Sequence, residues 1–420
     1  MPKKNILYAQ SGGVTAVINA TASGVISAAR NQSELGKVYA ARNGIIGALR
    51  EELIDTSVLS NEVIAGLKYT PSGAFGSCRY KLKGIQENRE EYERLISVFK
   101  AHNIGYFFYN GGGDSQDTAH KVSQLSQEMG FPITCIGIPK TVDNDLPFTD
   151  NCPGFGSVAK YVAISTLEAS LDVASMCESS TKVFILEVMG RHAGWIAAAS
   201  ALAQKRSGGA PHIILFPEVV FDEEKFLDEV NKAVKQHGYC VIVASEGAKY
   251  ADGQFLAQMG SKDAFGHVQL GGVAPMLANL IKSKLKLKYH WAVADYLQRA
   301  ARHISSHTDV EHAFALGEAA VKLALENKNA VMPYIKRDSS SPYRWHIESV
   351  ELSKVANVER TVPPEYISEN GFGITEACRE YLSPLIEGES YPSYQNGLPL
   401  YVRPTFTMLE KKLEQDFVVR

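Results

Sequence analysis

The sequence predicts an α/β protein with mainly parallel strands, and two observations lead to this fold class. Short apolar segments rich in β-branched residues alternate with longer segments whose apolar residues recur at helical spacing. Polar or glycine-containing stretches follow these predicted strands one after another. In open α/β sheets, ligands bind beyond the carboxyl ends of the strands. We therefore expect a site lined by the loops that lead from strands into helices.

The predicted elements follow one another in βαβ order. The predicted strands are apolar runs that end in glycine, proline or polar residues: 5–9, 38–42, 104–109, 131–138, 182–188, 212–216 and 239–244. In one predicted helix, for example, apolar residues recur at Tyr92, Leu95, Ile96 and Phe99. The predicted helices cover 16–30, 87–102, 118–130, 158–176, 196–203, 222–237 and 310–327. Residues 331–420 contain many prolines, and we predict no particular structure for them.

The charge and hydropathy patterns exclude several classes of protein. With 420 residues, 45% hydrophobic and 21% charged, the chain can form two or three domains. The 43 Lys and Arg against 46 Asp and Glu give a net charge of -3 without a basic block, so no nucleic-acid partner is expected. The alternating lysines Lys282, Lys284, Lys286 and Lys288 are expected to form a solvated face.

The cellular environment is predicted from the same composition. No apolar run approaches the ~20 residues that span a bilayer, and residues 1–4 lead into a strand-like run rather than a signal peptide. The 6 cysteines have no paired spacing, so neither a disulfide framework nor a zinc site is expected. We expect a cytoplasmic protein without a membrane partner.

The densest group of chemically active side chains follows the predicted strand 131–138. Pro139 ends this strand, and the next residues are Lys140, Thr141, Val142, Asp143, Asn144 and Asp145. Two carboxylates, an ammonium and a hydroxyl at a strand end indicate a binding or catalytic loop. The alternative is an Asx-type turn in which Asp143 and Asn144 cap the following segment.

Two further loops contain features of phosphate binding. Gly12 and Gly13 lie between a strand and a helix, where backbone N–H groups can hold an anion. A plain tight connection explains these glycines equally well. Arg79 ends a small and flexible stretch, from which it can reach a phosphate or remain on the surface.

The loop from Gly111 to Ser115 predicts a metal. Three successive glycines precede a helix that is expected to begin near Gln116, which indicates a sharp turn or a close approach to a ligand. The carboxylate of Asp114 would repel a phosphate unless a cation joins them. Magnesium typically bridges a carboxylate and substrate phosphate oxygens, so Mg2+ is the expected cofactor.

Taken together, these residues resemble the phosphofructokinases, and in particular their pyrophosphate-dependent branch. The shared motifs occur in the family's order: Gly12-Gly13, Gly76 to Arg79, Gly111 to Ser115, Pro139 to Asp145, Met189 to Arg191, Glu246-Gly247 and Tyr296 to Arg299. The resemblance implies two α/β/α three-layer domains with mainly parallel sheets that face each other across a cleft. Residues 1–150, completed by part of 240–300, would hold the phosphate donor, and residues 151–330 the sugar phosphate. Residues 331–420 would be a C-terminal extension.

The reaction implied by the resemblance moves a phosphoryl group to the C1 hydroxyl of fructose 6-phosphate, giving fructose 1,6-bisphosphate. Asp143 would be the general base for that hydroxyl, and Arg79 would neutralise the phosphoryl group in transfer. Around Asp143, the sugar-phosphate site would comprise Thr141, Val142, Met189, Gly190, Arg191, Glu246, Tyr296, Leu297, Gln298 and Arg299. Lys182 stands where relatives carry an arginine that reaches a neighbouring subunit's sugar phosphate. A homodimer or homotetramer is therefore expected.

Two positions favour pyrophosphate over ATP as the donor. ATP-using relatives have glycine at the position of Asp114, and a carboxylate there repels the nucleotide's α-phosphate and fills its space. They also have glycine at the position of Lys140, whose ammonium would stabilise the leaving phosphate. Gly113 replaces the family's magnesium aspartate, so Asp114 is expected to serve both metal and donor selection, with Asp145 nearby. The donor site would comprise Gly12, Gly13, Gly112, Gly113 and Ser115, with Lys140 and Asp114.

Three other functions share some of these features. An ATP-dependent phosphofructokinase would have to tolerate Asp114. A catalytically silent subunit that senses sugar phosphates would not need Asp143 as a base. A lipid or NAD kinase has a related glycine-rich loop but does not account for Met189 to Arg191 or Tyr296 to Arg299. Because pyrophosphate chemistry is close to energetic balance, we expect a reaction that runs in both directions.

Overall fold

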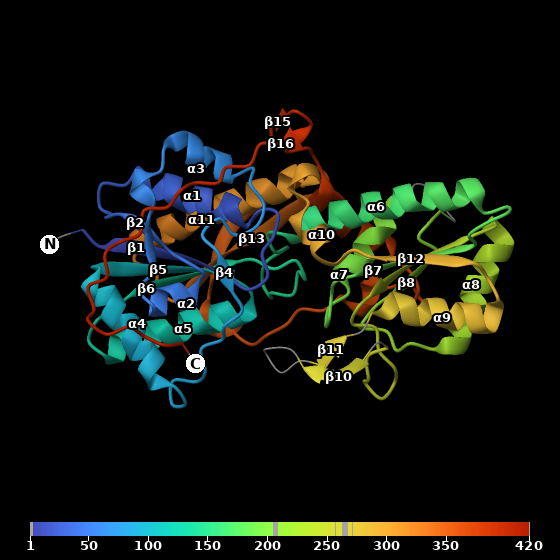
Figure 1. The fold of residues 1–420 in the computed structure, drawn as a ribbon, viewed down its shortest axis with the longest axis horizontal. Coiled ribbons are helices and arrows are strands. Elements are labelled where there is room, and N and C mark those ends of the chain that lie inside the picture. Colours follow the sequence, from blue (N-terminus) through green and yellow to red (C-terminus); the bar gives the residue numbers. More distant parts are fainter. Residues whose placement is uncertain (1–2, 205–208, 257, 263–267, 271, 420) are drawn as a thin grey trace.

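The computed structural model describes residues 3–204, 209–256, 258–262, 268–270 and 272–419. Two lobes lie side by side, each built on its own sheet with helices on both faces (Figure 1). Both sheets are mainly parallel. The predicted α/β fold class is confirmed.

The first sheet has the strand order β14-β13-β6-β5-β1-β2-β3, with the short β4 also paired to β1. Strands β1, β2, β5, β6 and β13 run parallel to one another, whereas the edge strands β3 and β14 are antiparallel to β2 and β13. The strands are β1 (Asn5–Ser11), β2 (Val38–Ala41), β3 (Leu53–Asp55), β4 (Ser77–Cys78), β5 (Ile104–Gly111), β6 (Thr134–Pro139), β13 (Val331–Ser340) and β14 (Tyr343–Glu351).

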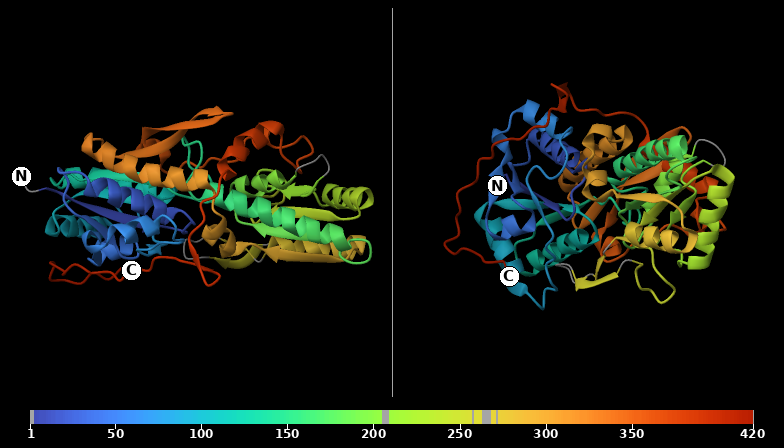
Figure 2. Two further views of the ribbon diagram at one scale, coloured as in Figure 1. Left: turned by 90° about the horizontal axis from the view of Figure 1, so that it is seen from above. Right: turned by 45° about the vertical axis from the view of Figure 1, so that its right-hand side comes forward.

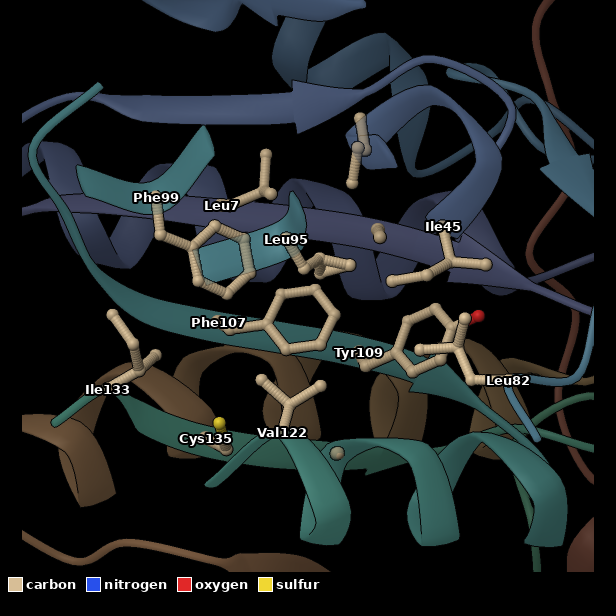
Figure 3. Packing of buried hydrophobic residues seen from close by; sticks show 14 of the residues in the cluster. Leu7, Ile45, Leu82, Leu95, Phe99, Phe107, Tyr109, Val122, Ile133 and Cys135 are labelled. Atoms are coloured by element: carbon tan, nitrogen blue, oxygen red, sulfur yellow. The ribbon is translucent and has the colours of Figure 1, made fainter. Parts of the chain in front are cut away.

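Helices cover both faces of this sheet because its side chains alternate between two apolar layers. On β1, Leu7 faces one layer while Ile6 and Tyr8 face the other. The first layer, shown in Figure 3, packs Phe107 and Tyr109 of β5 against the helices on that side. Those helices are α2 (Ile45–Leu49), α4 (Arg89–Ala101) and α5 (Gly113–Glu128), and the opposite face carries α1 (Ile18–Arg30), α3 (Asn61–Leu67) and α11 (His307–Leu325).

The second sheet is parallel throughout and has the order β12-β7-β9-β8. Its strands are β7 (Val183–Val188), β8 (Ile213–Leu215), β9 (Cys240–Ser245) and β12 (Tyr289–Val293). One face packs on α6 (Phe155–Met176) and α7 (Trp195–Ala199), and the other on α8 (Glu223–His237) and α9 (Val273–Leu285). The hairpin β10 (Gln258–Lys262) and β11 (Val268–Leu270) is a separate pair, and α10 (Asp295–Ala300) follows β12.

The sheets divide the chain differently from the predicted ranges. Strands β13 and β14 belong to the first sheet, and helix α11 packs on it. All three elements follow the whole second sheet in the sequence. The reason is apolar burial, because Val331, Met332 and Ile335 of β13 are buried beside β6. The first lobe therefore includes α11 from within the predicted range 151–330, and β13 and β14 from within the predicted C-terminal extension.

The remaining C-terminal residues cross both lobes. Helices α12 (Leu352–Val355) and α13 (Glu376–Leu382) pack on the first and second lobes respectively. After the small hairpin β15 (Tyr394–Gln395) and β16 (Leu398–Pro399), the chain runs back along the first lobe, as both Figures 1 and 2 show. Met408 forms an antiparallel bridge with Ile54 on the edge strand β3.

The predicted solvated lysine face is confirmed, and two helix starts differ. The lysines at 282, 284, 286 and 288 are exposed, as predicted for a solvated face. All six cysteines are free thiols. Within the described part of the chain, none of the helices has the length and apolar character that a membrane span requires. Helix α5 begins at Gly113 rather than near Gln116, and α6 begins at Phe155 rather than Val158.

Candidate active site

A cleft of about 450 Å³ lies between the lobes, at the carboxyl ends of strands from both sheets. Loops that follow β1, β5 and β6 line it on one side, and loops that follow β7, β9 and β12 line it on the other. The lining side chains include Arg79, Lys140, Asp143, Arg191, Glu246 and Arg299. This is the position expected for a ligand site in open α/β sheets.

Asp143 lies in the cleft in a loop that turns directly after β6. Its backbone N–H donates to Thr141 Oγ1 at 3.1 Å. Burial, with the nearby carboxylates of Asp145 and Glu246, raises the pKa of Asp143 to about 7. The cations Lys140 and Arg79 oppose that rise. A carboxylate with a pKa near neutrality is a stronger base than an ordinary aspartate, which suits proton abstraction from a hydroxyl.

The next residue, Asn144, is structural. Its backbone has φ +55°, its side chain is completely buried, and its Oδ1 accepts from the N–H of Cys152 at 2.9 Å. Its Nδ2 donates to the hydroxyl of Tyr381 at 2.9 Å. The side chain of Asn144 thus ties the loop to a residue eight positions further along the chain, whereas an Asx turn bonds the backbone two residues on. The side chain of Asp143 faces the cleft.

Lys140 is a buried cation beside the first glycine loop. Its side chain is 4% exposed, and its Nζ donates to the carbonyl of Gly13 at 2.8 Å. Burial lowers the pKa of Lys140 to about 8, against the opposing effect of Asp143 and Asp145. A methyl group on Gly13 would lie 2.6 Å from Arg299 Nη1 and 3.3 Å from Arg79 Nη2. Glycine at this position therefore lets two guanidinium groups approach the loop to which Lys140 is bonded, which favours the anion-binding interpretation over a plain turn.

The loop after β5 presents the N-terminus of α5 to the same cleft. Gly112 precedes the helix, and a Cβ on Gly113 would meet nothing within 4 Å, so there is room for a ligand. Ser115 Oγ donates to Ser11 Oγ at 2.8 Å and joins this loop to the end of β1. Asp114 is exposed and pairs with Lys81 Nζ at 2.5 Å.

The opposite wall carries the residues predicted for the sugar phosphate. Gly190, at φ +127°, donates its N–H to Glu246 Oε1 at 3.4 Å, and burial raises the pKa of Glu246. The guanidinium of Arg299 stacks over the ring of Tyr296 at 4.0 Å. Gln298 is buried and accepts from the N–H of Met189 at 3.4 Å, so it supports the wall rather than forming it.

Two predicted residues lie away from this cleft. Lys182 directly precedes β7, at the end of the strand opposite to Met189, and its Nζ donates to the carbonyl of Cys177. The side chain of Leu297 is 67% exposed and does not line the cleft. The structure brings the other predicted residues together in the cleft or, as with Gly190 and Gln298, directly behind its wall.

Among the residues that line the cleft, sequence reasoning missed four with acidic or basic side chains: Lys81, His192, Asp295 and Glu359. His192 Nδ1 lies 3.0 Å from a carboxylate oxygen of Glu359. Lys81 could have been found as a second cation two residues after Arg79. Glu359 had no such signal, because it lies in the C-terminal residues and reaches the cleft only through the fold.

The residues present fit a magnesium ion held together with substrate phosphates. Asp145 Oδ1 is buried and, within the described part of the chain, accepts no hydrogen bond. The described residues contain no cluster of three or more His, Cys, Asp or Glu side chains that could hold a metal by themselves. Magnesium is usually bound through one or two carboxylates plus phosphate oxygens, so the cleft carboxylates match that mode rather than a closed protein site.

A protein-family model matches most of the chain. The model described as "PFK: Phosphofructokinase" matches residues 5–324. The chain belongs to the phosphofructokinase family. This result confirms the family predicted from the motifs.

Relatives and solved structures extend the similarity beyond the family model. The pyrophosphate--fructose 6-phosphate 1-phosphotransferase of Halomonas elongata is 64% identical over 416 residues, covering 99% of both chains. The protein of the same name from Methylococcus capsulatus is 63% identical over 420 residues, covering 100% of both. The crystal structure of the pyrophosphate-dependent phosphofructokinase of Marinobacter aquaeolei has 63% identity and a TM-score of 0.91, and the similarity covers 99% of this chain and 100% of that one.

Proposed function

We propose that this protein transfers a phosphoryl group between pyrophosphate and the C1 hydroxyl of fructose 6-phosphate. The products of the forward reaction are fructose 1,6-bisphosphate and phosphate. The observation that carries the proposal is the cleft itself, where Asp143 lies between a buried ammonium and the wall formed by Arg191 and Glu246. The names of relatives with 57–64% identity support the same reaction.

Asp143 would take the proton of the C1 hydroxyl as that oxygen attacks phosphorus. The bond from the bridging oxygen of pyrophosphate to the transferred phosphorus breaks, and phosphate leaves. Phosphoryl transfer has a loose transition state, so positioning and charge neutralisation supply most of the catalysis. Lys140, Arg79 and Arg299 meet around the Gly13 loop and would neutralise this charge.

The donor preference would come from Asp114 and Lys140. The exposed carboxylate of Asp114 stands at the start of α5, where a helix N-terminus otherwise attracts phosphate. A longer donor would have to place a further phosphate beside that carboxylate, which costs electrostatic energy. Pyrophosphate is short enough to avoid it. We also propose that Asp114 and Asp145 hold Mg2+ with the donor, and the bound metal would neutralise phosphate oxygens.

Two assays test the reaction and the donor. The purified protein should form fructose 1,6-bisphosphate from fructose 6-phosphate and Mg2+ with pyrophosphate but not with ATP. The Asp143→Asn protein, purified in the same way, is the control for contaminating kinases and should be nearly inactive. Activity of the wild type with ATP alone would refute the donor argument, and inactivity with both donors would refute the reaction.

The donor residues can be tested within the same assay. The double variant Asp114→Gly with Lys140→Gly should lose activity with pyrophosphate and gain activity with ATP, because both changes remove the groups that distinguish the donors. An unchanged ratio of the two activities would show that donor choice lies elsewhere.

We further propose that the protein acts as a homodimer or homotetramer in which Lys182 serves a neighbouring subunit's sugar-phosphate site. Two features support this. The N–H of Lys182 donates to the carbonyl of Lys288 at 2.9 Å, and Lys288 directly precedes the edge strand β12. Trp291 and Val293 on that strand are 44% and 40% exposed. Light scattering coupled to size-exclusion chromatography would give the mass, and a monomer would contradict the proposal.

A further inference from the structure

The segment 357–362 crosses from one lobe to the other beside the cleft, which Glu359 lines. Asn357 Nδ2 donates to Asp117 Oδ1 on α5 at 3.3 Å, and Glu359 pairs with His192 beyond β7. The N–H of Val362 donates to Glu218 Oε1 at 2.9 Å, an oxygen that also accepts from the N–H of Gly194. The segment therefore touches the donor side and the sugar side of the cleft within six residues.

Arg360, in the middle of this segment, binds the backbone of the catalytic loop. Its Nε and Nη2 donate to the carbonyl of Asn144 at 3.2 and 2.9 Å. Its Nη1 donates to the carbonyls of Thr149 and Asp150 at 2.6 and 3.0 Å. The N–H of Arg360 donates to the carbonyl of Asp145 at 2.6 Å. Every carbonyl in this set lies in the loop that follows Asp143.

The same guanidinium is fixed from the second lobe. It lies 5.1 Å from the ring centroid of Trp195, the first residue of α7, and Trp195 Nε1 donates to the carbonyl of Arg360 at 3.3 Å. Trp195 is 2% exposed and belongs to the apolar core on that face of the second sheet. Arg360 therefore connects the rigid core of one lobe to the irregular catalytic loop of the other.

The loop needs such support because it has little regular structure. Asn144 has a positive φ of 55° and Phe148 one of 69°, both rare for residues other than glycine. Such a conformation persists only where surrounding contacts hold it. Asn144 separates Asp143 from Asp145, so the position of its carbonyl helps to fix the direction of both carboxylates.

We propose that Arg360 is a positioning residue for the catalytic loop. It holds the carbonyls of residues 144, 149 and 150 so that the carboxylate of Asp143 points at the reacting hydroxyl, and it does so without touching either substrate. The proposal rests on the function proposed above. A planar guanidinium is needed because it bonds three carbonyls in fixed directions, which the ammonium of lysine cannot reproduce.

Replacement of Arg360 tests this role against a matched control. The control is Arg379→Gln, because Arg379 is another arginine of the C-terminal residues that donates to a carbonyl, that of Ala201 at 3.0 Å, and does not line the cleft. Arg360→Gln should lower kcat by roughly 10²-fold, the size expected for a misplaced catalytic group. The KM values for fructose 6-phosphate and pyrophosphate should change little. Arg379→Gln should keep kcat near that of the wild type, even if its melting temperature falls as far as that of Arg360→Gln.

Arg360→Lys provides a second test in case the glutamine variant does not fold. Lysine keeps the positive charge over Trp195 but cannot bond all three carbonyls. It should restore only part of kcat, leaving it about tenfold below the wild type. Wild-type kcat in Arg360→Lys would refute geometric positioning, and so would equal kcat values in Arg360→Gln and Arg379→Gln.

The outcomes also separate this proposal from the proposed function. A wild-type protein without activity toward pyrophosphate and fructose 6-phosphate would refute the function. A fully active wild type, with Arg360→Gln as active as the Arg379→Gln control, would refute only the role of Arg360. A rise in KM without a fall in kcat would also count against it, because positioning of the base acts on the chemical step.

Discussion

The C-terminal residues contact the molecule in two places that differ in what they hold. Around Arg360 and Tyr381, polar side chains bond the loop that carries Asp143. From residue 400 onward, the chain lies along the first lobe, on the side of β3, and contributes apolar side chains to the two core layers (Figure 2). The first contact fixes the geometry of the site, and the second adds to the stability of the fold.

The second contact also has a polar anchor. Glu51 is completely buried at φ +59°, and His102 Nε2 lies 2.6 Å from its Oε1. Its carboxylate accepts from the N–H groups of Lys412 and Leu413 at 2.6 and 3.2 Å. One buried carboxylate thus fixes the backbone of the last residues, just as one guanidinium fixes the catalytic loop. The difference is that Glu51 and its partners His102, Lys412 and Leu413 do not line the cleft.

The largest effect should come from combining the two residues that act on the same step. Asp143→Asn should lower kcat by about 10²–10⁴-fold, because the general base is lost. Adding Arg360→Gln to it should cause little further loss, since a positioning residue has nothing left to position. Steady-state kinetics of the single and double variants give the comparison. Losses that multiply would show that Arg360 acts independently of Asp143.

Removal of residues 400–420 should lower the stability of the fold and leave kcat nearly unchanged. It takes away apolar contacts from both core layers, made by Val402, Phe406, Leu409, Leu413 and Phe417. We expect a loss of about 3 kcal/mol in the free energy of unfolding, since partial burial and chain entropy reduce the full transfer value. Urea unfolding and kcat should be measured on the same preparation. A large fall in kcat at a temperature where the variant is folded would show that these residues also affect the geometry of the site.

The sequence predicted much of the fold and of the site, and the exceptions have a common cause. Strand ends in 5–9, 104–109, 131–138 and 182–188 lead to the cleft, because local apolar runs and glycines set these elements. Asp143, Lys140 and Arg79 were found because they belong to dense local motifs. Arg360, Glu359 and Glu51 had no local signal, since each acquires its role from residues far away in the chain.

The membership of β13 in the first sheet could not be predicted for the same reason. Its apolar residues indicate a strand at most, and nothing in their order says which sheet receives it. The choice depends on the free edge of β6 and on α11, which packs beside it on the same lobe. The start of α5 at Gly113 was also missed, because glycine is a poor helix former and begins this helix only where the turn after β5 requires it.

A smaller effect, on pH dependence, would sharpen the comparison between the contacts. The pKa of Asp143 is raised to about 7 by burial and neighbouring carboxylates, and that of Lys140 is lowered to about 8 by burial. In the free enzyme the base must be ionised and the lysine protonated, so kcat/KM should fall tenfold per pH unit below the first value and above the second. The pH values at which the activity falls on the acidic and basic sides should not change when residues 400–420 are removed. Profiles of kcat/KM against pH, measured with and without those residues, give the test.

The smallest effect should follow from Glu51→Gln. The amide removes the charge that His102 and the two backbone N–H groups bind, so the free energy of unfolding should fall by about 1 kcal/mol at pH 7. Burial raises the pKa of Glu51, but the bonds from Lys412, His102 and Leu413 outweigh it and leave the pKa below its usual value of 4.5. A lowered carboxylate pKa gives stability above 4.5 that disappears as the pH falls through the folded value. The difference between wild type and Glu51→Gln should therefore shrink in acid, with kcat at neutral pH unchanged. A constant difference from pH 7 to pH 3 would mean that packing of the last residues, rather than the charge on Glu51, holds them in place.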